Sequence, residues 1–360
     1  MSGGVDSSVA AFLLKEQGYG CTGAMMKLYT DEIIGIADLP AAANRGCCSI
    51  EDSEDARAVA SALGIPFFVF NFSDSFGVEV MDRFISAYKA GRTPNPCIDC
   101  NRYMKFEKFL KRATELEVEY IATGHYAKVS REPGGRFLLS RGVDISKDQT
   151  YVLYAMTQAQ LARTLFPLGG LTKDEVRDIA ANLSFSTAHK RDSQDICFAP
   201  DKDYAGFIER YTGQASKAGD FISPEGKVLG RHRGLIHYTI GQRKGLGLYG
   251  SEPVFVSAIN PEANTVTVGP PEDLFSKSLV ARDINLIPMD KLDGPLNVQA
   301  KVRYSQPAQE ARVWQTGPDE IHLEFEKPQR AITPGQAVVM YDGDVVVGGG
   351  TISPHLLHNY

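Results

Sequence analysis

Hydrophobic positions in the first half of the chain follow two different periods. Apolar residues recur at helical spacing over residues 7–16, 51–63, 75–87 and 105–116. Short apolar runs typical of strands lie between these segments, namely CTGAMMKLY (21–29), PFFVFNF (66–72) and EYIATGHY (119–126). Helices that connect apolar strands predict crossover connections and a parallel sheet. Ligands bind such sheets at the carboxyl ends of the strands. Four residues lie at these ends or just after them: Asp6, Met26, Gly124 and His125.

The second half of the chain has a different pattern. From Gly219 onward it is rich in Gly, Val, Ile and turn residues, and SPEGKVLG, NPEANTVTVG and YDGDVVVGGG each predict a hairpin. No long helix is expected after about Tyr211. The pattern predicts an α/β domain over residues 1–205, a small β-rich linking domain over 206–270, and a barrel or sandwich over 271–360. The break falls near Gly269, Pro270 and Pro271.

Composition narrows the class of protein. A chain of 360 residues with no apolar run of 18 or more predicts two or three globular domains and no membrane span. The Gly- and Ser-rich start is unlike a signal peptide, so we expect a cytoplasmic protein. Six cysteines in such a protein indicate metal or redox chemistry rather than a disulfide framework. The net charge of -6 argues only weakly against a nucleic-acid partner, because residues 89–112 and 217–245 are locally basic.

The stretch SGGVDSS, residues 2–8, has the composition of a phosphate-binding loop. Its glycines permit tight turns and close approach of a ligand, its serines supply hydroxyl groups, and the N–H groups of the following helix favour an anion such as pyrophosphate. Asp6 could hold a Mg²⁺ ion that bridges phosphate oxygens. No GKS or GKT follows, so the stretch is not a Walker loop. The simpler alternative is a glycine turn in which Ser7 caps the helix.

The cysteines suggest a second site. Cys97 and Cys100 form a CxxC motif, and Cys197 follows about a hundred residues later. Pro94 and Pro96 stiffen the approach and disfavour a helix, so we expect an extended, polar loop. Three other interpretations of these cysteines are open. They could be structural zinc ligands, for which a fourth ligand would be needed. They could also form a simple dithiol, or be buried and inert. Cys21 is expected to be a small buried hydrophobe in a strand, and Cys47 and Cys48 could form a site of their own.

The loop resembles the signature of the PP-loop ATP pyrophosphatases, which form adenylates and release pyrophosphate. Further motifs along most of the chain are similar to landmarks of the tRNA-specific 2-thiouridylase family. In order, these are KAGRTPNP, ATGHYA, DISKDQTYVLY, LFPLGGLTKDEVRDIA, DSQDICF, HYTIGQRKGLG, VRYSQ and TPGQAVVMYDGDVVVGGG. The resemblance implies an N-terminal PP-loop domain, a small central tRNA-binding domain and a C-terminal β-barrel.

The resemblance also implies the reaction. Members of the family replace the 2-carbonyl oxygen of the wobble uridine (U34) with sulfur in tRNAs for Lys, Glu and Gln. ATP adenylates that oxygen, Cys197 carries sulfur as a persulfide, and Cys100 is the nucleophile that releases the product and leaves a disulfide with Cys197. The sulfur comes from a relay protein or from free sulfide. Thiolates are the reactive species, and Lys190, Arg191 or Arg102 could lower their pKa values.

The resemblance assigns binding residues by position. ATP contacts are implied for Ser2, Gly3, Gly4, Asp6, Ser7, Met26 and Gly124. Contacts with the target base are implied for Asn95, Pro96 and Cys97. Contacts with tRNA are implied for His125, Lys147, Asp148, Gln149, Arg303, Tyr304 and Gln336. Taken alone, Lys147 and Arg303 would be ordinary surface charges, and Tyr304 could stack on a base or lie in the barrel core.

The sequence departs from the family at two places. Many members have an aspartate, taken as a general acid or base, where this chain has Cys97. Asp99 could replace it if residues 97 and 99 share one face of an extended loop. Alternatively, Cys97, Cys100 and Cys197 could hold a [4Fe–4S] cluster whose open iron binds sulfide. The strand that precedes the loop in the family is absent. A missing central strand would expose two strand edges, so we expect a late start codon or a truncation. The alternative is that another segment fills the gap.

Two other functions remain at this stage. One is a small-molecule ligase of the pyrophosphatase superfamily, which the cysteine trio and the β-rich half disfavour. The other is a non-catalytic tRNA-binding or iron–sulfur protein. Pyrophosphate release that depends on tRNA would separate all three.

Overall fold

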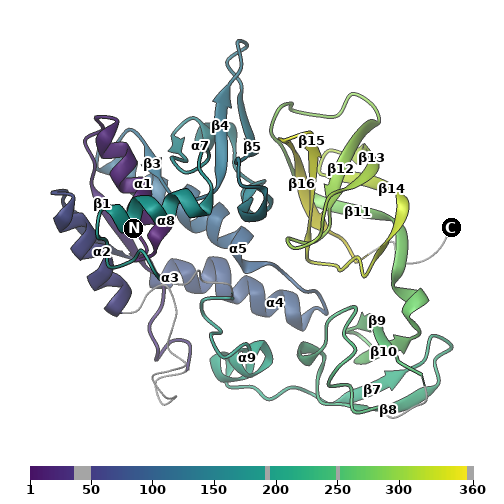
Figure 1. Ribbon diagram of the computed structural model, residues 1–360. Coiled ribbons are helices and arrows are strands. Elements are labelled where there is room, and N and C mark those ends of the chain that lie inside the picture. The colour runs from purple at the N-terminus through teal and green to yellow at the C-terminus, as the bar shows by residue number, and fades with distance from the viewer. Residues whose placement is uncertain (36–49, 191–194, 249–251, 355–360) are drawn as a thin grey trace. The chain divides into compact units, whose positions relative to one another are not determined.

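The structure is a computed structural model that describes residues 1–35, 50–190, 195–248 and 252–354 (Figure 1). It divides into two compact units. The first consists of Met1–Val80, Cys97–Asp203 and Asp344–Val346, and the second of Met81–Pro96, Tyr204–Gly343 and Val347–Tyr360. Residues 81–96 therefore belong with the second unit although they lie inside the first predicted domain. The domain ranges 1–205, 206–270 and 271–360 stay a prediction.

The first unit alternates helices and strands, as the sequence predicts. Its helices are α1 (Val5–Glu16), α2 (Ile50–Ala62), α3 (Ser73–Phe76), α5 (Pro96–Asp99), α6 (Phe109–Glu115), α7 (Gln158–Leu161) and α8 (Lys173–Asn182), with π-helical turns at Gly77–Asp82 and Cys100–Lys108 and 3₁₀ turns at Ile145–Lys147 and Thr150–Val152. Its strands are β1 (Gly23–Lys27), β2 (Phe67–Asn71), β3 (Ile121–Ala122), β4 (Ala127–Arg131), β5 (Phe137–Arg141) and β6 (Thr164–Leu165).

The parallel pairing of these strands is confirmed. β1 pairs with β2 in parallel from Gly23 opposite Phe67 to Lys27 opposite Asn71, and β3 pairs with β6 in parallel. Within the described residues the two pairs form separate two-stranded sheets, and the amino group of Met1 donates a hydrogen bond to the carbonyl of Ala24 on β1. β4 and β5 form an antiparallel hairpin, seen above α7 in Figure 1.

Helices α1, α2 and α8 pack together through apolar faces. Val9 on α1, Val59 on α2 and Val176 on α8 are buried in one cluster. Helix α8 begins with a capping box, in which Thr172 and Glu175 satisfy each other's backbone N–H groups. This cap fixes the first turn of α8, and the packing sets that turn beside the first turn of α1.

The second unit carries the predicted hairpins. Helices α4 (Arg83–Lys89) and α9 (Tyr204–Thr212) precede a four-stranded sheet in the order β8-β7-β10-β9, formed by β7 (Gly219–Ile222), β8 (Val228–His232), β9 (Phe255–Asn260) and β10 (Thr265–Gly269). Short 3₁₀ turns lie at Leu235–His237 and Pro271–Leu274. Phe221, Tyr238 and Val266 are buried in the core of this part.

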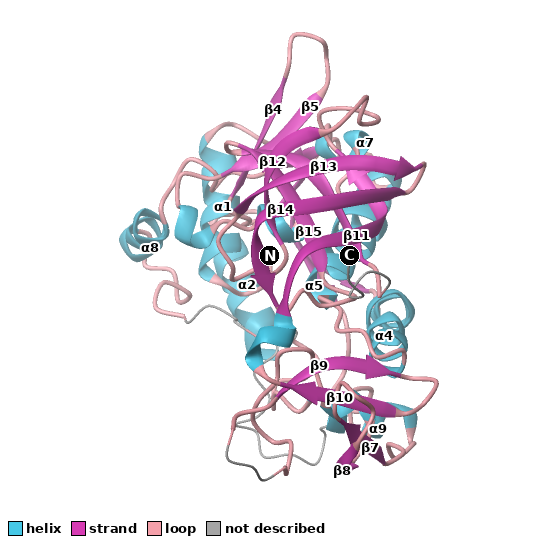
Figure 2. Cartoon of the chain, turned by 90° about the vertical axis from the view of Figure 1, so that its right-hand side faces the viewer, coloured by secondary structure: helices cyan, strands magenta, loops and turns pink. Residues whose placement is uncertain are grey.

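A closed six-stranded barrel completes the second unit (magenta strands β11–β15 in Figure 2). Its strands are β11 (Phe275–Leu286), β12 (Leu296–Lys301), β13 (Gln309–Gly317), β14 (Glu320–Arg330), β15 (Ala337–Asp342) and β16 (Val345–Ile352). The order β11-β14-β13-β12-β15-β16 closes through pairing of β11 with β16. Alternate residues of β14, namely Ile321, Leu323 and Phe325, point into a buried core, so the predicted barrel is confirmed.

The search for membrane-spanning helices gave a negative result: among the described residues, no helix is both long and apolar enough to cross a bilayer.

Candidate functional site

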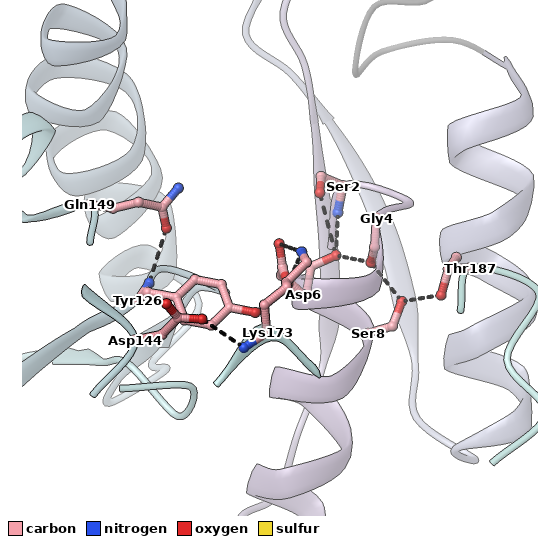
Figure 3. Close-up of polar contacts among 10 residues, drawn as sticks. Ser2, Gly4, Asp6, Ser8, Tyr126, Asp144, Gln149, Lys173 and Thr187 are labelled. Atoms are coloured by element: carbon pink, nitrogen blue, oxygen red, sulfur yellow. Dashed lines mark hydrogen bonds and ion pairs between the residues drawn. The ribbon is translucent and has the colours of Figure 1, made fainter. Parts of the chain in front are cut away.

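Residues 2–4 of the SGGVDSS stretch lead into α1, and residues 5–8 form its first turn (Figure 3). Two serine hydroxyls hold this stretch in place: Ser7 and Ser8 donate to the carbonyl of Gly4 at 3.1 and 2.9 Å, and Ser2 donates its backbone N–H to the Ser7 hydroxyl at 3.1 Å. Thr187 contacts the Ser8 hydroxyl from outside the loop at 3.3 Å. The first-turn N–H groups of a 12-residue helix thus end at a shaped loop, which is a suitable site for an anion.

Gly3 is required by its position in this loop. Its φ is +69°, and a Cβ atom at this position would lie 2.3 Å from the carbonyl oxygen of Asp52 on α2. Asp52 and Asp55 in turn hold the ammonium of Lys190 at 2.5 and 2.8 Å. Burial lowers the pKa of Lys190, but hydrogen bonds to the two carboxylates outweigh burial and raise it. Lys190 is therefore engaged with α2, and its predicted action on the cysteines stays a prediction.

Asp6 is the centre of a polar cluster beneath the loop (Figure 3). Its Oδ1 accepts hydrogen bonds from the Tyr126 hydroxyl at 2.8 Å and from Lys173 Nζ at 2.7 Å, and its Oδ2 lies 2.9 Å from the same Nζ. The Lys173 side chain is only 8% exposed, whereas that of Asp6 is 32% exposed. A buried cation therefore stands beside the anion site, held by a carboxylate that water can still reach.

The support of this cluster comes from two neighbouring loops. The backbone N–H of Lys173 donates to Asp144 Oδ2 at 3.0 Å, and the backbone N–H of Tyr126 donates to Gln149 Oε1 at 3.0 Å. Gly124 lies directly against the loop, because a Cβ there would come within 2.7 Å of the Asp6 backbone and 2.9 Å of the Ser7 nitrogen. The predicted ATP residues at positions 2–7 and 124 are thus brought together, and Met26 lies near the carboxyl end of β1.

Lys173 and Tyr126 were missed in the sequence analysis. Both lie inside quoted motifs, LTKDEVRDIA and ATGHYA, but nothing in the sequence relates them to Asp6, 167 and 120 residues away. The available signal is the TKDE capping box, because it places Lys173 in the first turn of a helix, where parallel-sheet folds build their sites.

The CxxC motif is helical, so the prediction of an extended loop is wrong. Pro96 is the first residue of α5, and Cys100 begins the π-helical turn that follows it. A proline at the first helical position needs no N–H partner and has a suitable φ, so Pro96 starts the helix rather than preventing it. Residues three apart share a helix face, so Cys97 and Cys100 lie on one side and Asp99 does not. The geometric reason for Asp99 as a substitute fails, and its role stays a prediction.

The cysteines differ in burial. Cys97 is exposed, while Cys100 and Cys197 are half-buried. Tyr29 donates its hydroxyl to the backbone carbonyl of Cys197 at 2.7 Å, and the neighbouring Phe198 is buried edge-on against Phe76. These contacts anchor the Cys197 backbone. Across the described part of the chain, no three His, Cys, Asp or Glu side chains are gathered to hold a metal ion. The possible cluster set Cys97, Cys100 and Cys197 therefore stays a prediction.

The remaining cysteines have separate outcomes. Cys21 lies just before β1 and is half-buried, so the prediction that it is a buried residue within a strand is wrong. Burial raises its pKa, and Lys15 partly offsets that effect. Cys47 and Cys48 lie outside the described residues, as does Arg191.

The tRNA residues predicted in the first unit have structural partners. His125 is buried in a three-ring cluster with Phe106 and Phe166, and Thr123 contacts its Nδ1 at 2.7 Å. Burial and nearby Lys105 hold the pKa of His125 well below its usual value, which favours the neutral form of the ring. Asp148 is buried and accepts two hydrogen bonds from Thr150. Lys147 lies in a short 3₁₀ turn, and Gln149 supports Tyr126.

The tRNA residues predicted in the second unit line one pocket. Arg303 donates from Nη2 to the Ala331 carbonyl and the Thr333 hydroxyl, both at 2.8 Å. Tyr304 is 44% exposed, with the ammonium of Lys301 5.9 Å from its ring centre, which argues against a place in the barrel core. The pocket encloses about 250 Å³ and is lined by Thr93, Thr239, Arg303, Tyr304, Ser305, Thr333 and Gln336. Arg303, Tyr304 and Gln336 are thus brought together.

These features define a class first: an α/β domain with a PP-loop for nucleotide phosphates, joined to two β-rich parts. The families described as tRNA methyl transferase HUP domain, tRNA methyl transferase PRC-barrel domain and Aminomethyltransferase beta-barrel domain match residues 1–201, 205–270 and 276–352. The particular family follows from full-length relatives. The chain is 51% identical to the tRNA-specific 2-thiouridylase MnmA of Lachnoclostridium phytofermentans, over 98% of each chain. It is 50% identical to the protein of that name from Clostridioides difficile, over 99% of this chain and 97% of the relative. The chain belongs to the tRNA-specific 2-thiouridylase family.

One solved structure shows a weak similarity. The U34-tRNA thiolase NcsA of Methanococcus maripaludis, solved with its [4Fe–4S] cluster, shares 19% identity, with a TM-score of 0.33 over 59% of this chain and 68% of that chain. Similarity at this level carries no argument about the cysteines.

Proposed function

We propose that this chain, a tRNA-uridine 2-sulfurtransferase by family, uses ATP to replace the 2-carbonyl oxygen of U34 with sulfur in tRNAs for Lys, Glu and Gln. The observation that carries the proposal is the loop at the N-terminus of α1 with the buried Lys173 beside it, in a chain that matches 2-thiouridylases over almost its full length. The anion site supplies the adenylating half of the reaction, and the cysteines supply the sulfur-transferring half.

The loop and Lys173 would bind the phosphates of MgATP. The α1 N–H groups and the serine hydroxyls are donors for phosphate oxygens. A rotamer change would bring the ammonium of Lys173 from Asp6 to the same phosphate oxygens. Arriving phosphates would compete with Asp6 for Lys173. The carboxylate released from Lys173 would then hold the Mg²⁺ that accompanies ATP. Asp6 and Lys173 thus form a pair that keeps the site neutral before the nucleotide binds.

Adenylation makes the oxygen of uridine a leaving group. The 2-carbonyl oxygen attacks the α-phosphorus of ATP and releases pyrophosphate, after which C2 carries AMP in place of a poor oxide leaving group. The anticodon loop presents U34 unpaired, which lowers the cost of bringing it to a pocket. Asn95, Pro96 and Cys97 would meet this base.

Sulfur transfer would use Cys197 and Cys100. The terminal sulfur of a Cys197 persulfide attacks C2 and displaces AMP. The Cys100 thiolate then attacks the Cys197 sulfur, the S–S bond to the transferred sulfur breaks, and a Cys100–Cys197 disulfide remains for an external dithiol to reduce. Movement of the chain would bring the two thiols together. Because the described cysteines are not gathered as metal ligands, we derive no step through a [4Fe–4S] cluster, which stays a hypothesis.

The second unit would hold tRNA around the pocket at Arg303, Tyr304 and Gln336. An exposed tyrosine beside a lysine suits stacking on a base, and the arginine suits a phosphate. The sulfur donor would be a relay protein that passes on a persulfide sulfur. Free sulfide would serve instead by attacking Cys197 in the Cys100–Cys197 disulfide, which forms the Cys197 persulfide and releases Cys100 as a thiolate without a further oxidant. We expect the reaction to take place in the cytoplasm.

The test is direct detection of the product. Unmodified tRNA-Lys is incubated without oxygen with this chain, ATP, Mg²⁺ and sulfide, and nucleosides are analysed by mass spectrometry. We expect 2-thiouridine only when ATP and the chain are both present, with pyrophosphate release that requires tRNA. Pyrophosphate release without tRNA would instead favour a small-molecule ligase, and tRNA binding with neither product would favour a non-catalytic binder.

A further inference from the structure

The segment before the CxxC motif is attached to the barrel by its backbone. Thr93 donates its N–H to the carbonyl of Pro334 at 2.9 Å and accepts a hydrogen bond at its own carbonyl from Gln336 Nε2 at 2.8 Å. Both polar groups of one peptide residue are therefore held by a single turn, Pro334–Gln336. All of these residues belong to the second unit.

The turn is itself tied to the barrel. Gly335 donates its N–H to the Ile352 carbonyl at 2.9 Å, and Ile352 donates to the Gln336 carbonyl at 2.8 Å. Gly335 has a φ of +90°, and a Cβ there would lie 2.9 Å from the Arg92 Cβ and 3.0 Å from the Thr93 nitrogen. The close approach of the two backbones thus depends on a glycine, so this contact is built into the sequence of the turn.

The other side of the segment is held by the four-stranded sheet and the end of α4. Helix α4 ends in a Schellman arrangement, in which Gly91 donates to the Tyr88 carbonyl and Arg92 to the Ala87 carbonyl. Gly91 has a φ of +67°, and a Cβ there would lie 2.9 Å from Ile259 Cγ2. Residues 91–93 are therefore fixed from both sides, immediately before Asn95 and Pro96.

We propose that Gln336 is a positioning residue for the target-base segment Thr93–Pro96, and that the turn Pro334–Gln336 is the part of the barrel that fixes it. The consequence for catalysis rests on the proposed function, in which Asn95 and Pro96 meet U34. The Gln336 amide also lines the pocket with Arg303 and Tyr304, so a nucleotide bound there would contact the same side chain that supports the base segment.

The first test needs neither tRNA nor activity. Hydrogen exchange is measured on the free, full-length protein carrying Gln336→Ala. Gln329→Ala is the matched control, since Gln329 lies on the same barrel and its amide donates to the nearby Lys327 carbonyl. Prolines 94 and 96 have no N–H, so the peptide over 90–97 reports on few amides, Thr93 among them. We expect exchange there to rise by about two- to tenfold, the range for loss of one hydrogen bond, in Gln336→Ala alone. Unchanged exchange overturns the proposal.

The second test separates positioning from direct tRNA contact. For Gln336→Ala we expect kcat for thiolation to fall by about tenfold, whether or not KM for tRNA also rises through loss of the pocket contact. A rise in KM with unchanged kcat would make Gln336 a tRNA contact only and would contradict the proposal. Gly335→Ala should give the same exchange pattern with a larger amplitude, and parent-like exchange in that variant also overturns it. If the parent itself shows no thiolation, the proposed function fails, but the exchange measurement still decides whether Gln336 fixes the segment Thr93–Pro96.

Discussion

Lys173 and Asp6 form an ion pair that joins the first turn of α8 to the first turn of α1. Lys173 Nζ lies 2.7 Å from one carboxylate oxygen and 2.9 Å from the other, across 167 residues of sequence. The pair stands at the N-terminal end of α1, where the helix N–H groups favour an anion. A pair in this place can open when phosphate arrives, because phosphate competes for Lys173 and Mg²⁺ competes for Asp6.

Replacing Lys173 by Gln should therefore impair ATP use and leave tRNA binding intact. The variant keeps a hydrogen-bonding side chain but has no charge for phosphate, so we expect kcat/KM for ATP to fall by about 100-fold, the scale seen when one stabilising group of a site is removed. Lys111→Gln, on the exposed side of α6, is the matched control. Pyrophosphate release in the presence of tRNA measures the effect. Parent-like kinetics for Lys173→Gln would contradict the proposal that Lys173 leaves Asp6 to bind phosphate.

Tyr126→Phe tests the support of Asp6. The variant removes a single hydroxyl at 2.8 Å from Asp6 and leaves the ring in the buried cluster with Val5 and Val9. We expect a loss of about 0.5–1.5 kcal/mol in the free energy of unfolding. We also expect a several-fold rise in KM for ATP. Urea unfolding and initial rates at varied ATP measure the two effects, and an unchanged KM would show that the hydroxyl serves stability alone.

How much of this site the sequence predicts depends on the range of the contact. The stretch Ser2–Ser8 is local, and its residues predict a glycine turn that leads into a helix, as the structure has it. The anion site at that helix N-terminus stays a prediction. Lys173 reaches the loop only through the packing of α8 on α1, which a single sequence does not specify. Pro96 shows a different limit: proline disfavours the helix interior but favours the first turn, and only the structure determines which rule applies.

The second unit shows the same limit at larger scale. Glycine-rich turns and alternating residues predict the hairpins, and their closure into a barrel follows from the resemblance to the family. The sequence does not show that residues 81–96 belong with this unit. That membership depends on Thr93 and the turn Pro334–Gln336, more than 240 residues away, and on Gly91 against Ile259.

Acid should destabilise the first unit through His125. Its folded pKa lies well below the usual value because of burial, so below about pH 6.5 the unfolded chain binds a proton that the folded chain does not. The free energy of unfolding therefore falls as pH drops through this range, by up to about 1.4 kcal/mol per pH unit for one such group. His232 has its pKa lowered mainly by burial and acts in the same direction in the second unit.

The measurement is urea unfolding at about pH 7.5 and 5.5, which lie above and below the ordinary histidine pKa. His125→Gln removes the titrating group, so its loss of stability between the two pH values should be smaller than the parent's. His322→Gln on β14, whose ring centre lies 4.6 Å from that of Trp314, is the control for loss of a histidine outside the first unit. An equal slope in His125→Gln would show that other groups cause the acid sensitivity.

Cys97→Asp separates the two routes for sulfur. In the persulfide route Cys97 is not a sulfur carrier, and an aspartate at this position restores the residue that many family members have. We expect Cys97→Asp to keep activity within about tenfold of the parent, whereas Cys100→Ser and Cys197→Ser should lose it by at least about 1000-fold, as for essential nucleophiles. In a cluster route all three thiolates are ligands, and Cys97→Asp should be as inactive as the other two. Purification without oxygen provides the independent measurement. A colourless, active parent supports the persulfide route. A brown parent with four irons per chain, whose iron and activity are both lost in Cys97→Asp, would overturn it.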